Sequence, residues 1–261
     1  DAAGNITQPA DLLFLGGGLE STASRNATAL FIEGSMNPSD RLEVKGALRY
    51  EDLESDSSVD PKIAFRYQAS DELALRASFS TSFREASLAQ LTSTNISLQG
   101  IQDYNADGSA KGGTAFIRIA QANNPNLEPE ESENMNIGAM WNPTDKLSMK
   151  LDYWAIDYTN VITIESAQGK VAATPFDSDV KRTAGGTLTG VTTKYFNAAN
   201  VNTSGLDFES TYDFDTSFGQ AQVGVNMMHM FEYEIPVGNT TKDVVGLFNH
   251  DNFARSLPDT K

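Results

Sequence analysis

The residues of this sequence that have the spacing of a metal site lie in the segment DYNADGSAKGGT, which begins at Asp103. Asp103, Asn105 and Asp107 place oxygen ligands at alternate positions, and Gly108 follows where a calcium loop turns sharply. The twelfth position, however, is Thr114, where a calcium loop needs a bidentate glutamate, and no flanking helices are predicted. We therefore predict an exposed polar turn, with a weak extracellular calcium site as the alternative hypothesis.

Other residue types that support catalysis or metal binding are scarce. The chain has 2 histidines, His229 and His250, and neither has the neighbours of a zinc site. It has 0 cysteines, which excludes disulfides, thiolate zinc sites and cysteine nucleophiles. The glycine-rich segments FLGGGLE and TAGGTLTG follow no buried strand and open no helix, and no G-x-S-x-G motif is present. We predict that the protein is not an enzyme and has no catalytic residues, and we expect no cofactor beyond the possible calcium ion.

Composition restricts the classes of partner. The 261 residues carry 35 acidic and 19 basic side chains, a formal net charge of -16, which argues against a nucleic-acid partner because phosphate binding needs clustered lysine and arginine. No window approaches 18 consecutive apolar residues, so a membrane-spanning helix is excluded. A membrane-spanning β-barrel remains open, since its strands alternate apolar and polar residues and have low mean hydropathy.

The elements that must position these residues have a period of two. In residues 42–51, LEVKGALRYE, one face carries Leu42, Val44 and Leu48 while the other carries Glu43, Lys45 and Arg49. The same alternation predicts strands at 62–68, 73–84, 134–141, 147–154, 206–214 and 222–228, and a less regular one at 26–36 because Phe31 falls on its polar face. The apolar face of the seven regular strands has no charged residue. The sequence therefore predicts an all-β protein of about eight strands, either a barrel or a β-sandwich.

The connections between these strands are unequal in length. Tight turns are predicted at NPSDRL, QASDEL and NPTDKL, which begin at Asn37, Gln68 and Asn142, and at DFDTSFG around Asp215. The connections at 85–132, 158–200 and 234–261 are long. In an antiparallel meander, alternate connections lie at the same end of the sheet, so one end has tight turns and the other has long polar loops. That asymmetry is typical of outer-membrane barrels, with short periplasmic turns and long extracellular loops.

Aromatic residues of the apolar face support this interpretation. They gather near both ends of the predicted strands, as the two aromatic belts of a membrane barrel do. Those near the tight turns are Tyr67, Trp141 and Phe214, and those near the opposite ends are Tyr50, Phe83 and Tyr153.

Two motifs resemble the β-barrel of TonB-dependent outer-membrane receptors. In that family, a strand that ends in a Phe-Arg-Ala-Pro-Ser-like motif precedes a variable loop, and an Asn-Pro-x-Leu-x-Pro-Glu-x-Ser segment opens the next strand. The first motif is matched by Phe83, Arg84 and Ser87, with departures at Glu85 and Ala86. The second motif is matched by Asn124, Pro125, Leu127, Pro129, Glu130 and Ser132. The resemblance spans roughly residues 27–233, and it places the prolines and glutamates of NPNLEPEESEN on the returning arm of an outer loop.

The resemblance implies an antiparallel up-and-down transmembrane β-barrel in the bacterial outer membrane, a receptor that imports a scarce ligand with energy supplied through TonB. We expect residues 1–261 to be an internal part of one barrel domain, with the plug domain and the barrel C-terminus absent. The implied partners are outer-membrane lipid, the TonB complex acting through the missing plug, and a siderophore, cobalamin, oligosaccharide or peptide ligand. The alternatives are a passive porin or adhesin barrel, and a soluble secreted β-sandwich that serves as a binding module.

The sequence does not identify the ligand-binding residues, but it supplies candidates. Basic side chains of the polar face could pair with acidic plug or wall residues, or stay solvated in a wet interior. They are Lys45, Arg49, Lys62, Arg66, Arg76 and Arg84. Aromatic residues of the predicted loops could contact a ligand. They are Tyr104, Phe116, Phe176, Tyr195 and Phe196.

Overall fold

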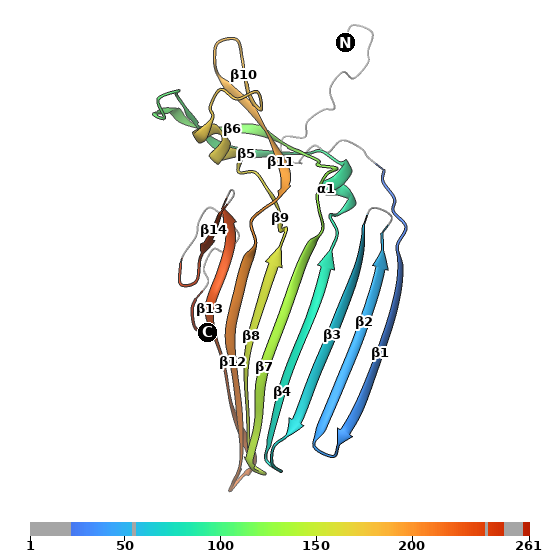
Figure 1. Ribbon diagram of the computed structural model, residues 1–261. Helices are drawn as coiled ribbons and strands as arrows, with labels where there is room; N and C mark the ends of the chain where they lie inside the picture. Colours follow the sequence, from blue (N-terminus) through green and yellow to red (C-terminus); the bar gives the residue numbers. More distant parts are fainter. Residues whose placement is uncertain (1–21, 54–55, 238–239, 248–257) are drawn as a thin grey trace. The chain divides into compact units, whose positions relative to one another are not determined.

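The computed structural model describes residues 22–53, 56–237, 240–247 and 258–261, which divide into two compact units (Figure 1). The sheet unit comprises the described residues of 26–85, 129–161 and 198–261. The loop unit comprises the described residues of 1–25, 86–128 and 162–197. His250 lies outside the described residues. Within the described residues, no helix is both long and apolar enough to cross a membrane.

The sheet unit is a single nine-stranded sheet in which every neighbouring pair is antiparallel. The strands are, in order across the sheet, β1 (Thr28–Ser39), β2 (Leu42–Asp52), β3 (Ser57–Gln68), β4 (Leu73–Arg84), β7 (Glu130–Thr144), β8 (Leu147–Thr159), β12 (Val201–Thr216), β13 (Gly219–Val237) and β14 (Thr240–Asp243). The eight predicted strands are thereby confirmed: β4 has the predicted bounds, β1 begins two residues later and ends three later than predicted, and the other six are longer by one to several residues.

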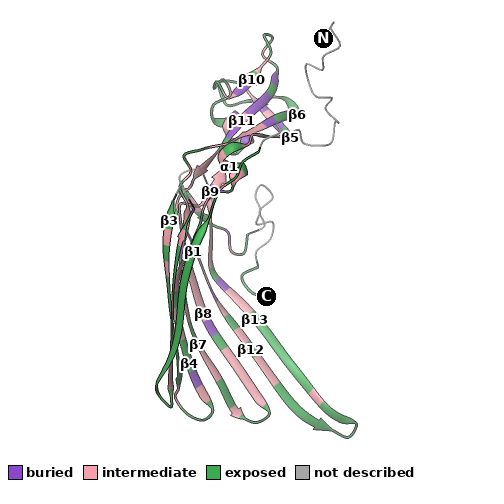
Figure 2. Ribbon diagram, turned by 90° about the vertical axis from the view of Figure 1, so that its right-hand side faces the viewer, coloured by how far each residue is buried: buried purple, intermediate pink, exposed green. Residues whose placement is uncertain are grey.

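The register confirms the two predicted faces of the sheet. Phe65 of β3 pairs with Val44 and Ala77, and Ile137 of β7 pairs with Ala77 and Tyr153, so apolar residues meet apolar residues along the sheet. The apolar side chains are largely exposed, with Ile137 at 54%. Figure 2 shows this in the strands, which are mostly exposed or intermediate along their length. A face that stays apolar and uncovered fits lipid better than water.

The asymmetry of the connections is also confirmed. Residues 40–41, 69–72, 145–146 and 217–218 form short turns that all lie at one end of the meander. The long connections between β4 and β7 and between β8 and β12 leave from the other end. The prediction of a third long loop at 234–261 is wrong at its start, because β13 continues to Val237 and pairs with β14. As predicted, Pro125 and Pro129 lie outside the strands, directly before β7.

The two long connections fold into the loop unit. The first contributes α1 (Leu88–Thr92), β5 (Asn95–Tyr104) and β6 (Ala110–Ala122), and the second contributes β9 (Ile162–Ile164), α2 (Ala167–Ala173), β10 (Val180–Arg182) and β11 (Leu188–Asn197). The sheet order is β10-β11-β6-β5, with β9 paired to the far end of β11. β6 of the first connection pairs in parallel with β11 of the second connection, so the strands of the two connections form a single sheet.

A hydrophobic core holds the loop unit together. Residues of both connections meet under α2, including Ile101 and Ile119 from the first and Val171 and Val191 from the second. Each of these four side chains is at most 2% exposed. Figure 2 shows the buried residues gathered on β5, β6, β10 and β11. The two long connections are therefore long, as predicted, but they contain secondary structure and bury an apolar core that the sequence analysis did not predict.

Candidate functional site

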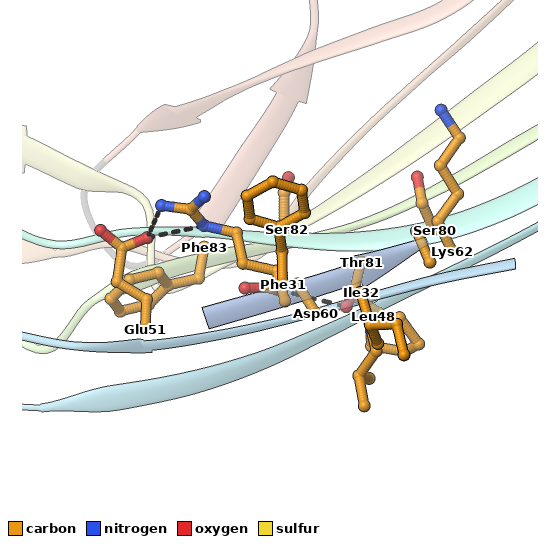
Figure 3. Close-up of a pocket in the computed structure, with 13 residues that line it drawn as sticks. Phe31, Ile32, Leu48, Glu51, Asp60, Lys62, Ser80, Thr81, Ser82 and Phe83 are labelled. Atoms are coloured by element: carbon orange, nitrogen blue, oxygen red, sulfur yellow. Dashed lines mark hydrogen bonds and ion pairs between the residues drawn. The ribbon is translucent and has the colours of Figure 1, made fainter. Parts of the chain in front are cut away.

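A hollow in the sheet unit, lined by residues of both faces, begins where Pro61 interrupts the pairing of β3 with β4. Proline has no backbone N–H to donate to a ladder, and the pairing of β3 with β4 extends only from Gln68 to Lys62. Beyond that point β3 continues to pair with β2. A cavity of about 380 Å³ lies at this gap, lined by residues of β1 to β4 (Figure 3).

Charged and hydroxyl side chains line this hollow. Arg49 donates two hydrogen bonds to Glu51, at 3.0 and 2.8 Å. The Asp60 carboxylate accepts a hydrogen bond from the Ser58 hydroxyl at 2.8 Å and another from the Thr81 hydroxyl at 3.3 Å. Because Thr81 is on β4 and Asp60 is on β3, the bond from Thr81 bridges the gap between these two strands. Figure 3 shows the Lys62 side chain extended beside Ser80. The aromatic ring of Phe31 borders the same hollow, on the polar face where the sequence placed it.

Most of the basic residues predicted to face the interior form ion pairs on the polar face. Arg84 pairs with Glu130, the first residue of β7, and Lys45 pairs with Glu43 at 3.1 Å. A further basic residue of this face, Lys150, pairs with Glu209 at 3.1 Å. The wall therefore supplies carboxylate partners for these basic side chains, which also remain exposed, with Lys45 at 61% and Arg84 at 56%.

The Arg76 ion pair crosses an entire strand. Its Nε donates to Asp152 Oδ1 at 2.7 Å and its Nη2 donates to Oδ2, although Arg76 lies on β4, Asp152 lies on β8, and β7 runs between them. The residue of β7 that pairs with both is Gly138. A Cβ at Gly138 would lie 2.0 Å from Asp152 Oδ1, so this contact requires glycine. The sequence analysis missed this pair because its members are 76 residues apart.

A second glycine of the polar face accommodates a large side chain. Trp154 of β8 lies over Gly205 of β12, where a Cβ would be 2.6 Å from the indole Cζ2. On the other side of Trp154, Asn136 is its partner on β7. The indole therefore lies close to the backbone of β12, at a position that has room for it because residue 205 is glycine.

An uncharged polar ladder joins β4 to β7 on the same face. Ser78 pairs with Asn136, Ser80 with Asn134 and Ser82 with Ser132. The Ser82 and Ser132 hydroxyls are 2.7 Å apart. Such hydroxyl and amide groups can hydrogen-bond water or a polar ligand, or the backbone of another protein segment.

The three predicted calcium ligands lie in or beside the turn between β5 and β6. Both carboxylate oxygens of Asp103 accept hydrogen bonds from Arg182, at 2.6 and 2.8 Å, and this pairing lowers the Asp103 pKa below its usual value. Asn105 donates to the Ser109 hydroxyl, while Asp107 accepts from the Ser109 backbone and hydroxyl. No group of three or more candidate ligands that could hold a metal ion is found among the described residues. Calcium binding here remains a prediction, which calorimetry at millimolar calcium would test.

Three ion pairs with little or partial exposure instead stabilise the loop unit. Arg182 of β10 and Asp103 of β5 join the two connections, and their side chains are 10% and 11% exposed. Lys170 of α2 contacts Glu165 at 2.7 Å and Asp179 at 2.8 Å. Burial lowers the Lys170 pKa, but the hydrogen bonds to both carboxylates outweigh that effect and raise it overall.

The predicted loop aromatics do not form one cluster. Tyr104 packs against the core, Phe116 is 81% exposed, and Phe176 lies 5.0 Å from the Arg182 guanidinium. Tyr195 and Phe196 pair with β9. His229 belongs to the sheet unit, where its Nδ1 lies 2.8 Å from the Thr260 hydroxyl and its ring contacts Phe231 edge-on.

The family model "TonB dependent receptor-like, beta-barrel" matches residues 2–254. No curated protein matches the chain. Several solved structures are similar in fold. The siderophore receptor PirA from Pseudomonas aeruginosa is 18% identical with a TM-score of 0.56, over 80% of this chain and 35% of that one.

Two further structures give the same result. A mutant of the ferric enterobactin receptor PfeA from Pseudomonas aeruginosa, in complex with enterobactin, is 18% identical with a TM-score of 0.58, over 79% of this chain and 27% of that one. The siderophore receptor PirA from Acinetobacter baumannii is 16% identical with a TM-score of 0.56, over 85% of this chain and 30% of that one. The chain therefore spans about a third or less of the length of these structures.

Proposed function

Since the chain belongs to the TonB-dependent receptor-like β-barrel family, we propose that it forms part of the wall and two outer loops of a receptor that imports a scarce ligand with energy supplied through TonB. Proteins of this family are transport receptors of the bacterial outer membrane. The exposed apolar face of the sheet is accordingly its lipid-facing surface, and the polar face lines the lumen.

The observation that carries this proposal is the difference between the two ends of the meander. One end has four short turns, while the two long connections at the other end build a folded unit with a buried core. A passive pore needs no such unit, whereas a receptor needs a rigid structure outside the membrane on which binding residues are positioned. The loop unit is therefore the part of this chain that we assign to ligand capture.

The ligand class is a separate proposal. Siderophore, cobalamin, oligosaccharide and peptide ligands are all compatible with a receptor of this family. The similar structures include siderophore receptors, so a ferric siderophore is the first ligand to test.

The test is uptake of radiolabelled ligands by cells that carry or lack the receptor gene, each with and without TonB. We expect uptake of one ligand class that needs both proteins. Uptake that continues without TonB would instead indicate a passive porin. Absence of uptake for every ligand class, with retained cell attachment, would indicate an adhesin.

A variant separates the role of the loop unit from folding of the barrel. Replacing Phe116, which is 81% exposed, should leave barrel assembly intact because this side chain makes little contact with the core. If the exposed face of the loop unit contributes to capture, F116A weakens ligand binding, while F176A serves as a second exposed aromatic variant. Unchanged binding in both variants would remove these aromatics from the capture surface.

A further inference from the structure

Two arginines lie directly opposite each other on the lumen-facing side of the sheet. Arg66 of β3 and Arg76 of β4 are Cα partners in the antiparallel ladder. Like charges in directly opposite positions destabilise a sheet. The arrangement therefore needs a counter-charge, and the neighbouring residues show how much of it the wall supplies.

These arginines belong to one transverse row that crosses six strands. Successive Cα partners along this row are Glu43, Arg66, Arg76, Gly138, Asp152 and Asp207. The guanidinium groups lie on β3 and β4, and two carboxylates lie on β8 and β12. The two arginines of the row thus lie side by side between Glu43 on β2 and the carboxylates of β8 and β12.

Among the described residues, only Asp152 forms an ion pair with either of the two arginines. Asp152 reaches over Gly138 to Arg76 and engages its Nε and Nη2, which leaves Nη1 without a hydrogen bond among the described residues. Glu43, the other partner of Arg66, pairs with Lys45 at 3.1 Å. Within the part of the chain that the structure describes, Arg66 donates only to the neutral Gln68 side chain, at 2.8 Å. Lys62, on the same face of β3, forms no ion pair with any described residue.

We propose that Arg66 and Arg76 form an anion-binding site in the lumen wall, and that its ligand is a carboxylate or similar oxyanion. The Asp152 contact holds Arg76 in place with its Nη1 donors free, and the two forks suit an oxyanion that bridges them. Of the carboxylates in the row, Asp152 is the one that pairs with either arginine among the described residues, and it pairs with Arg76, so Arg66 lacks a carboxylate partner there.

The position of the site distinguishes it from a capture site for incoming ligand. Arg66 is two residues before the end of β3 and Arg76 is three residues after the start of β4, so both lie beside the short turn 69–72. That is the end of the meander opposite the long connections. The oxyanion is therefore a carboxylated solute near the inner end of the lumen, or a carboxylate side chain of another segment of the receptor.

The direction in which the single substitution R66Q shifts the midpoint of thermal unfolding tests the proposal. If the site is empty, R66Q removes a repulsion and raises the midpoint of thermal unfolding. If an anion bridges the two arginines, R66Q removes an attraction and lowers it. The measurement uses the full-length receptor in detergent, at low ionic strength, with and without millimolar citrate, and with chloride matched for ionic strength.

The control is R49Q. Arg49 lies on the same face, is similarly exposed, and already has Glu51 as its partner. An exposed ion pair contributes little to stability, so R49Q should change the midpoint slightly and leave any citrate effect in place. Asp207 gives a second control, because D207N removes a charge of the same row outside the site.

Three results are decisive. A midpoint that citrate raises in the wild type, with apparent citrate affinity about tenfold weaker in R66Q but not in R49Q, establishes a solute site. A midpoint insensitive to citrate, but lowered by R66Q in a salt-dependent manner, establishes a carboxylate from the receptor itself. A midpoint that R66Q raises or leaves unchanged, without a specific citrate effect, overturns the proposal. None of these results depends on whether the receptor transports its ligand.

Discussion

Replacing Gly138 by alanine should destabilise the sheet unit by about 2–3 kcal/mol. A Cβ at this position would lie 2.0 Å from Asp152 Oδ1 and 2.9 Å from the Leu151 carbonyl oxygen. The Asp152 side chain must then rotate away from Arg76 and give up a hydrogen-bonded ion pair. The loss is about 1.5 kcal/mol, at the low end for such a pair, because the Arg76 side chain is 43% exposed. Displacing the Leu151 backbone adds about 1 kcal/mol.

A double-mutant cycle separates these two contributions. In a D152A background the carboxylate is gone, so G138A should cost only the backbone part, about 1 kcal/mol. The difference between the two costs of G138A, about 1.5 kcal/mol, is the coupling between the glycine and the ion pair. Urea unfolding of the receptor in lipid vesicles, followed by tryptophan fluorescence, measures each free energy of unfolding.

Gly224 provides the matched control. Gly224 is on β13 and lies on the polar face of the sheet, as Gly138 does. The atoms nearest to a Cβ at Gly224 would be 3.6 Å away, which is an ordinary contact distance. G224A should therefore change the free energy of unfolding by less than about 0.5 kcal/mol. The reasoning fails if G138A is as mild as G224A, or if removing Asp152 leaves the full cost of G138A in place.

Three further predictions concern other contacts. The Asp103 pKa is lowered by its hydrogen bonds from Arg182. This ion pair therefore contributes fully to the stability of the loop unit above about pH 4, which is the pKa of an aspartate in the unfolded chain. The contribution is lost as the pH falls through the lowered pKa of the folded state. D103N should remove this acid dependence from hydrogen-exchange protection of β5 and β10. Ile119 is 1% exposed in the core, so I119A should lower the free energy of unfolding of the loop unit by about 2–5 kcal/mol. Protease resistance of the loop unit measures this change. G205A should displace the Trp154 indole, seen as a shifted fluorescence maximum that a W154F background abolishes.

The sheet could be predicted because alternation and turn chemistry both act locally. Each strand's faces were visible within about ten residues, and Leu42, Leu73 and Leu147 each follow a turn signal and begin a strand as predicted. Phe31 was placed on the polar face by counting alone, and the register opposite Arg49 bears this out.

The missed features depend on residues that are distant in sequence. Ile117 and Ile119 alternate with Arg118, a signal that could have indicated a strand within the first long connection. Their partner strand β11, however, lies some seventy residues away, and parallel pairing leaves no turn signal between the two. The ion pair over Gly138 was missed for the same reason, since nothing near the glycine indicates which strands will be its neighbours.

The two units also differ in what stabilises them. In the loop unit, apolar side chains such as Val171 leave water on folding, so truncating them costs stability directly. In the sheet unit the apolar face is exposed and meets lipid, so its side chains do not form an internal core. The sheet is held by its ladders and by contacts on the lumen side, such as Arg76 with Asp152 and Trp154 over Gly205. Conservative apolar substitutions on the lipid face should therefore be tolerated, while even one added methyl group at Gly138 or Gly205 on the lumen face should not.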